Sequence, residues 1–110
     1  MKYPMKLQAP LKDYLWGGTR LRDEYGKAAQ TAKVAESWEL ACHRDGKSII
    51  ANGAAQGQTL ADWLAAEGGD ALGTRAAQFP YFPLLIKLID AHDNLSVQVH
   101  PSDDYALRVE

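Results

Sequence analysis

Three short segments with β-strand side-chain patterns constrain this fold more than any other feature of the sequence. Residues alternate along Val34–Cys42, so Glu36 and Trp38 are predicted to share one face of a strand. Leu84–Asp90 is apolar with two isoleucines, as in a central strand, and Leu95–His100 alternates again. Turn residues separate these segments, so the sequence predicts a mainly β domain.

Shorter pieces are predicted around the three strands. Met5–Tyr14 has mixed periodicity and is typical of edge strands. Arg44–Lys47 predicts a hairpin turn, because Asp-Gly tolerates positive φ values, and Ser48–Ala51 is the expected return strand. Asn52-Gly53 predicts a second turn.

Three short helices are predicted from their capping residues. Thr59 and Asp62 resemble a capping box, for a helix that should end at Gly68-Gly69. Thr19 should cap a short helix closed by Gly26, and Ser102 a helix with two aspartates in its first turn.

Length and charge exclude several classes of protein. The chain has 110 residues, 46% of them hydrophobic, which fits one domain. The net charge of -2 argues against a nucleic-acid partner, and no apolar run is long enough for a bilayer. A single cysteine and the lack of an apolar signal core favour the cytoplasm.

The segment Leu95–His100 carries the most informative polar residues. Period-2 geometry places Ser96, Gln98 and His100 on one face and two valines on the other. Gln98 and His100 could supply two ligands to one metal ion, whereas the alternative is a strand with one solvated side.

Two further positions have both a functional and a structural explanation. Lys87 lies in an apolar strand, either extending to solvent at a sheet edge or held in a cavity for an anion. Glu36 beside Trp38 could line a sugar site, or Trp38 could be core and Glu36 its rim. The pattern alone favours the structural explanation for both.

Four stretches together resemble the type I mannose-6-phosphate isomerases, the zinc-dependent phosphomannose isomerases, and the shorter bacterial form in particular. They are Tyr14–Gly18, Ala35–Leu40, Phe82–Ala91 and Leu95–Pro101, the last continuing to Ala106. Their order and spacing match, and together they span nearly the whole chain, as the N-terminal part of the family's domain.

The resemblance implies a cupin-type jelly roll, here its N-terminal part, with residues 1–110 forming a single domain. It implies interconversion of mannose 6-phosphate and fructose 6-phosphate through an enediol, assisted by Zn²⁺. By this resemblance Gln98 and His100 are zinc ligands, Lys87 acts on the substrate and Ser96 contacts its phosphate. Trp16, Glu36 and Trp38 match positions beside the sugar pocket.

The family's remaining zinc ligands, a glutamate and a second histidine, are expected beyond residue 110. Glu110 is therefore not expected to be a ligand, and this chain alone is expected to be inactive. Two alternatives stay open: a non-catalytic cupin-like module that binds sugar phosphates, and a purely structural β-sandwich fragment. The sequence after Glu110 would separate them.

Overall fold

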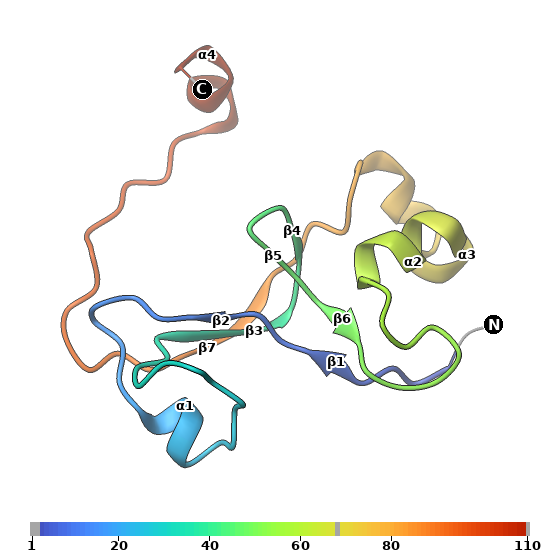
Figure 1. Ribbon diagram of the computed structural model, residues 1–110. Coiled ribbons are helices and arrows are strands. Elements are labelled where there is room, and N and C mark those ends of the chain that lie inside the picture. The colour runs from blue at the N-terminus through green and yellow to red at the C-terminus, as the bar shows by residue number, and fades with distance from the viewer. Residues whose placement is uncertain (1–2, 68, 110) are drawn as a thin grey trace.

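The computed structural model describes residues 3–67 and 69–109, so the predicted helix stop at Gly68 and residue Glu110 lie outside it. Seven short strands and four short α-helices make up the described chain (Figure 1), in agreement with the predicted mainly β fold with short helices. The strands are β1 (Leu7–Gln8), β2 (Leu11–Lys12), β3 (Glu36–Leu40), β4 (Cys42–His43), β5 (Gly46–Lys47), β6 (Ile49–Ile50) and β7 (Ile86–Ile89). The helices are α1 (Arg20–Asp23), α2 (Leu60–Glu67), α3 (Gly69–Leu72) and α4 (Asp103–Val109), with a 3-10 helix at Thr74–Gln78.

An antiparallel sheet with the order β2-β3-β7 is the largest of three small sheets. Lys12 of β2 pairs with Glu36 of β3, and Trp38 of β3 pairs with Lys87 of β7. The predicted central strand at Leu84–Asp90 is therefore wrong in one respect: β7 lies at the edge of this sheet and β3 is central. Composition reports how apolar a strand is, but the number of its neighbours depends on distant parts of the chain.

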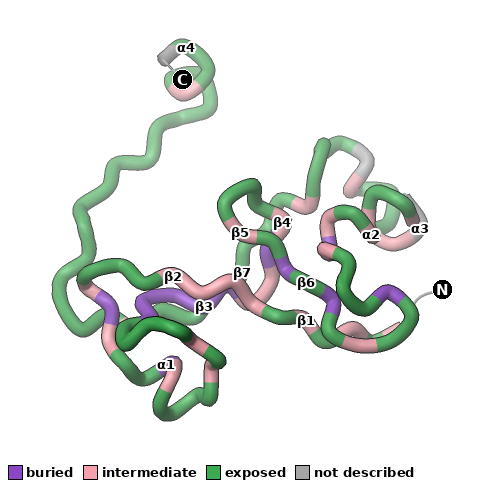
Figure 2. Tube along the Cα trace, in the orientation of Figure 1, coloured by how far each residue is buried: buried purple, intermediate pink, exposed green. Residues whose placement is uncertain are grey.

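The buried core follows β3 and continues to β6, whereas β7 is exposed along its length (Figure 2). Val34 and Ile50 are each 1% exposed, and Ser37 and Ser48 are fully buried. Ser48 Oγ accepts the Ala41 N–H at 2.9 Å, so this buried hydroxyl is satisfied.

The hairpin after β3 differs from its prediction. β4 pairs with β5 directly, while β6 in the predicted return strand pairs with β1 instead. Gly46 is also not one of the described glycines with positive φ. A glycine is needed there because a Cβ at Gly46 would lie 2.7 Å from the Trp38 ring.

The predicted helix starts are confirmed, although one of them is capped by a different residue. Thr59 Oγ1 accepts the Asp62 N–H at 3.1 Å, and Ser102 Oγ accepts the Tyr105 N–H at 3.3 Å. Thr19 makes no side-chain cap at α1. Asp90, at the end of β7, accepts the Arg20 N–H at 2.9 Å in its place.

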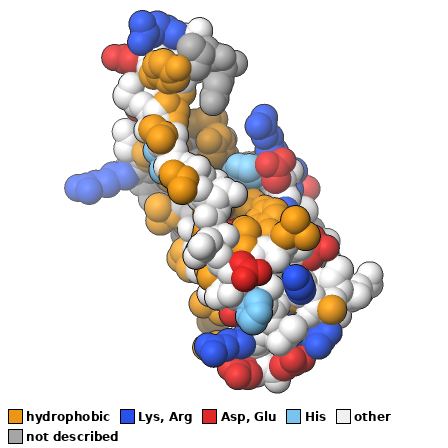
Figure 3. Space-filling view, turned by 90° about the vertical axis from the view of Figure 1, so that its left-hand side faces the viewer, with side chains coloured by type: hydrophobic (Ala, Val, Ile, Leu, Met, Phe, Trp, Pro, Cys, Tyr) orange, Lys and Arg blue, Asp and Glu red, His pale blue; other side chains and the backbone are white. Residues whose placement is uncertain are grey.

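The predicted strand at Leu95–His100 is wrong. Residues 94–102, which we call the arm, form no strand and run away from the body of the molecule to α4 (Figure 1). Val97 and Val99 are 98% and 91% exposed, and hydrophobic side chains lie open on this side of the molecule (Figure 3). A strand needs a neighbour to bond with, and none of the described strands lies beside the arm. No described helix is long and apolar enough to cross a bilayer.

Candidate functional site

A cavity of about 370 Å³, which we call the sheet-face cavity, opens on the face of the sheet that carries Trp38 and Lys87. Six of the seven predicted site residues line it, and His100 does not. Its lining is Tyr14, Trp16, Glu36, Trp38, Lys87, Ile89, Leu95, Ser96 and Gln98. The cavity thus joins the start of the chain, β3, β7 and the arm.

A buried carboxylate forms the polar centre of this cavity. Glu36 Oε1 accepts the Trp38 Nε1–H at 2.9 Å and lies 3.4 Å from Lys87 Nζ. The Glu36 side chain is only 8% exposed, whereas that of Lys87 is 36% exposed. A buried carboxylate requires such partners because desolvation disfavours its charge. Both explanations for Lys87 therefore hold in part. The residue lies on an edge strand, as the structural explanation predicted, and its ammonium reaches the cavity, as the functional explanation predicted.

The loop that carries Trp16 is fixed to the end of β7. The Trp16 carbonyl accepts the N–H groups of His92 at 2.8 Å and Asp93 at 3.1 Å. The Gly18 N–H donates to the Asp90 carbonyl at 3.2 Å. Gly17 must be glycine because a Cβ there would lie 2.6 Å from Ala35. Main-chain bonds therefore hold Trp16 at the edge of the cavity.

Tyr14 lines the cavity and was missed as a functional candidate, although it begins the first family-like stretch. Its ring lies 5.7 Å from that of Trp16 at 39°. Burial raises the pKa of Tyr14 above its ordinary value, and the charge of Glu36 raises it further. The phenol is therefore neutral at neutral pH and can donate a hydrogen bond.

The arm supplies the remaining predicted residues. Ser96 and Gln98 line the cavity, while His100 is exposed two residues further along. Among the described residues no three His, Cys, Asp or Glu side chains gather closely enough to hold a metal. Gln98 and His100 offer an amide oxygen and an imidazole nitrogen, two of the three or four protein ligands that zinc needs. The donor types suit zinc, but their number completes no site within the described chain.

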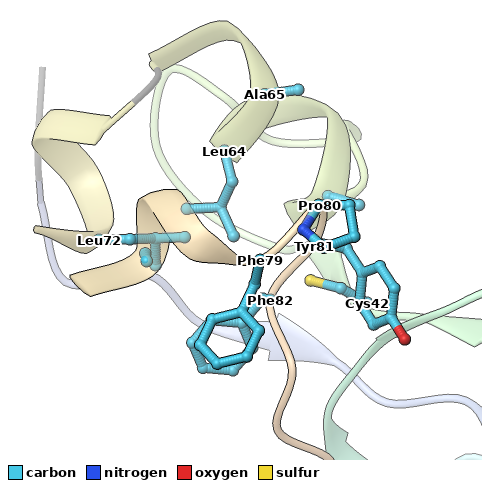
Figure 4. Close-up of a pocket in the computed structure, with 10 residues that line it drawn as sticks. Cys42, Leu64, Ala65, Leu72, Phe79, Pro80, Tyr81 and Phe82 are labelled. Carbon is cyan, nitrogen blue, oxygen red and sulfur yellow. The ribbon is translucent and has the colours of Figure 1, made fainter. Parts of the chain in front are cut away.

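A second cavity of about 390 Å³ lies between the helices and Phe79–Phe82 (Figure 4). Leu64 of α2 and Leu72 of α3 contribute to its lining, which is largely apolar. Burial raises the pKa of the Cys42 thiol there, and the nearby Lys47 only partly offsets this. Cys42 therefore stays protonated at neutral pH, and none of the lining residues that the structure describes is an acidic or basic side chain.

Comparison with known proteins settles the family. The family model for phosphomannose isomerase type I, catalytic domain, matches residues 5–109. The chain belongs to this family. The predicted membership is thereby confirmed.

Relatives support the assignment over nearly the whole chain. The chain is 44% identical over 109 residues to the probable mannose-6-phosphate isomerase GmuF of Bacillus subtilis, covering 96% of this chain and 33% of that protein. It is 41% identical to the mannose-6-phosphate isomerase of Streptococcus mutans, covering 100% of this chain and 34% of the relative. The chain thus spans about a third of the length of these curated relatives.

A solved structure agrees with the fold. The crystal structure of the mannose 6-phosphate isomerase from Bacillus subtilis matches with a TM-score of 0.86 at 35% identity, covering 98% of this chain and 33% of that one. This likeness is consistent with a portion of a cupin-type fold. Type I phosphomannose isomerases are metal-dependent and act on sugar phosphates.

Proposed function

We propose that the protein carrying this chain is a mannose-6-phosphate isomerase, which interconverts mannose 6-phosphate and fructose 6-phosphate. The observation that carries the proposal is the sheet-face cavity, in which six family-matched residues meet around the Glu36–Lys87 pair. The family assignment supports the same conclusion. The ligand is a small sugar phosphate, with no role for nucleic acid or a membrane, and the location is the cytoplasm.

The reaction requires charge stabilisation beside the sugar. Proton transfer between C1 and C2 passes through an enediol, so negative charge develops on an oxygen of the substrate. The Lys87 ammonium, held by Glu36 at 3.4 Å, stabilises that charge or the phosphate. Because Glu36 is nearly buried, solvent only weakly screens the interaction between its carboxylate and the Lys87 ammonium.

The other lining residues bind and orient the sugar. The indoles of Trp16 and Trp38 offer flat apolar surfaces to sugar C–H groups, and Glu36 accepts hydroxyl hydrogens. Ser96 is proposed to contact the phosphate with its hydroxyl. The polar groups fix orientation, and the apolar lining excludes water.

Gln98 and His100 are proposed as two ligands of a zinc ion. A zinc ion bound there would supply a Lewis acid for the substrate oxygens. The remaining ligands would come from outside the described residues. Gln98 lies in the cavity lining, so it would orient the metal toward the residues around Lys87.

The test is an isomerase assay on the longer protein that contains this chain. Purified protein with measured zinc content should convert mannose 6-phosphate to fructose 6-phosphate, detected by a coupled dehydrogenase. Lys6→Met should keep this activity, because Lys6 is exposed on the segment before β1 and lies outside the lining of the cavity. Binding of mannose 6-phosphate without turnover would overturn the enzyme proposal in favour of a non-catalytic sugar-phosphate module.

A further inference from the structure

A second lysine approaches Trp38 from the side of the sheet opposite β7. Lys12 belongs to β2, which pairs with β3 along the edge that β7 does not occupy. Its Nζ lies 4.4 Å from the centroid of the Trp38 ring, within the range of a cation–π interaction. The same Nζ donates to the Asp45 carbonyl at 2.6 Å. That acceptor is an uncharged main-chain carbonyl, which anchors the Lys12 side chain beside the indole.

Trp38 links Lys12 to Glu36, the polar centre of the cavity, through a hydrogen bond. The indole is 6% exposed, and its Nε1–H donates to Glu36 Oε1 at 2.9 Å. Glu36 in turn lies 3.4 Å from Lys87 Nζ. A cation over the ring withdraws electron density, which makes the indole N–H a better donor. Lys12 therefore acts on both the orientation of Trp38 and the strength of its bond to Glu36.

The other neighbours of Trp38 do not place a cation as close to the indole ring as Lys12 does. The His43 ring meets the indole edge-on, with centroids 5.6 Å apart, and Gly46 lies close against it. These neighbours limit the space around the indole, but neither carries a permanent charge. Lys87 Nζ is further from the ring, at 6.0 Å.

We propose that Lys12 is a positioning residue of the candidate active site, which holds Trp38 so that Trp38 fixes Glu36 and, through it, Lys87. This inference rests on the proposed isomerase function. It assigns Lys12 no contact with the substrate. It also makes the β4–β5 hairpin part of the support, because Asp45 supplies the carbonyl that holds Lys12.

Lys12→Met in the longer protein tests the proposal, since methionine keeps an apolar stem and removes the charge. We expect kcat, corrected for the folded fraction, to fall about tenfold while KM changes less. Lys12→Arg should restore most of this loss, because guanidinium also stacks on aromatic rings. Lys6→Met, which removes an exposed lysine outside the site, should leave kcat unchanged.

A second measurement does not depend on activity. The Trp38 indole N–H resonance, assigned by its loss in Trp38→Phe, should shift and exchange faster in Lys12→Met but not in Lys6→Met. If Lys12→Met does not fold, Lys12→Gln carries both measurements. Unchanged kcat, or an unchanged Trp38 resonance, would overturn the positioning role. A wild-type protein without isomerase activity would instead overturn the proposed function, and the resonance would still test how Lys12 holds Trp38.

Discussion

Val34–Cys42 and Leu95–His100 have the same alternating pattern and opposite structural outcomes. The first contains β3, which has a neighbour on each side and holds Glu36 and Trp38 nearly buried. The second lies in the arm, which pairs with none of the described strands and exposes Val97 almost completely. Alternation therefore predicts which side chains share a face, and a neighbouring strand decides whether that face is buried.

The two segments both contribute to the lining of the sheet-face cavity. The β3 wall is fixed by ladder bonds and by the Glu36–Trp38 hydrogen bond, and so is organised before any ligand arrives. The arm wall offers Ser96 and Gln98 without such support. Mutations in the two walls should therefore have different consequences.

The largest effect is expected on the arm. His100→Ala in the longer protein should abolish bound zinc and lower kcat/KM on the order of a thousandfold or more, because the proposed zinc ligand is lost. The far-UV circular dichroism should stay unchanged, since His100 is exposed. Val99→Ala on the same arm should keep its zinc. Stoichiometric zinc and normal turnover in His100→Ala would refute the ligand assignment.

The second prediction concerns Lys87, on β7 beside the β3 wall of the cavity. Lys87→Met keeps the stem and removes the charge, so kcat/KM should fall on the order of a hundredfold, as for the loss of a charged contact. Lys47→Met is the matched control, because Lys47 is exposed on the β4–β5 hairpin. Steady-state kinetics of both variants would decide the question, and normal values for Lys87→Met would show that this lysine is only a surface residue.

A pair of valines compares the two segments directly in the 110-residue chain. Val34→Ala, at a position 1% exposed, should lower the free energy of unfolding by roughly 2 kcal/mol through lost burial and a cavity. Val97→Ala, at a position 98% exposed, should change it by less than about 0.5 kcal/mol. Urea unfolding measures both, and equal losses would mean that the arm packs in solution.

The smallest effect concerns the other face of β3. Burial alone would raise the pKa of Glu39, but hydrogen bonds from Lys27 and Ser37 and the charge of Lys27 outweigh it, so the pKa is lowered. A carboxyl group with a lowered pKa stabilises the fold above its ordinary value of 4.5, and this contribution is lost as the pH falls through the lowered pKa. Glu39→Gln should remove this part of the acid dependence of urea unfolding. An identical pH profile in wild type and Glu39→Gln would contradict the shift.

Local patterns predicted the parts of the molecule that depend on neighbours in sequence. The shared face of Glu36 and Trp38 and the cap at Thr59 are of this kind. Contacts between distant segments were not predictable in the same way. The cap of α1 by Asp90 joins residues 70 positions apart, and nothing in the local sequence distinguishes it from a cap by Thr19.

The candidate site shows the same division. Resemblance to the family named the lining residues, yet it gave no sign of the contact between Lys12 and Trp38 or of the lining role of Tyr14. Both depend on register and loop geometry rather than on residue type. The strand pattern at Leu95–His100 failed because the pattern describes a possible sheet face and does not supply the neighbouring strand.

The two hydrogen bonds to the Trp16 carbonyl have a thermodynamic consequence. They tie the Trp16 loop to His92 and Asp93, immediately before the arm begins. A ligand that touches both Trp16 and Ser96 must therefore order the arm against an anchor that is already fixed at one end. Its measured affinity would include the entropy lost by residues 94–96 between that anchor and Ser96, at roughly 1–2 kcal/mol for each residue fixed. Covering the arm with further structure would remove that cost and tighten binding without adding a single contact to the sugar.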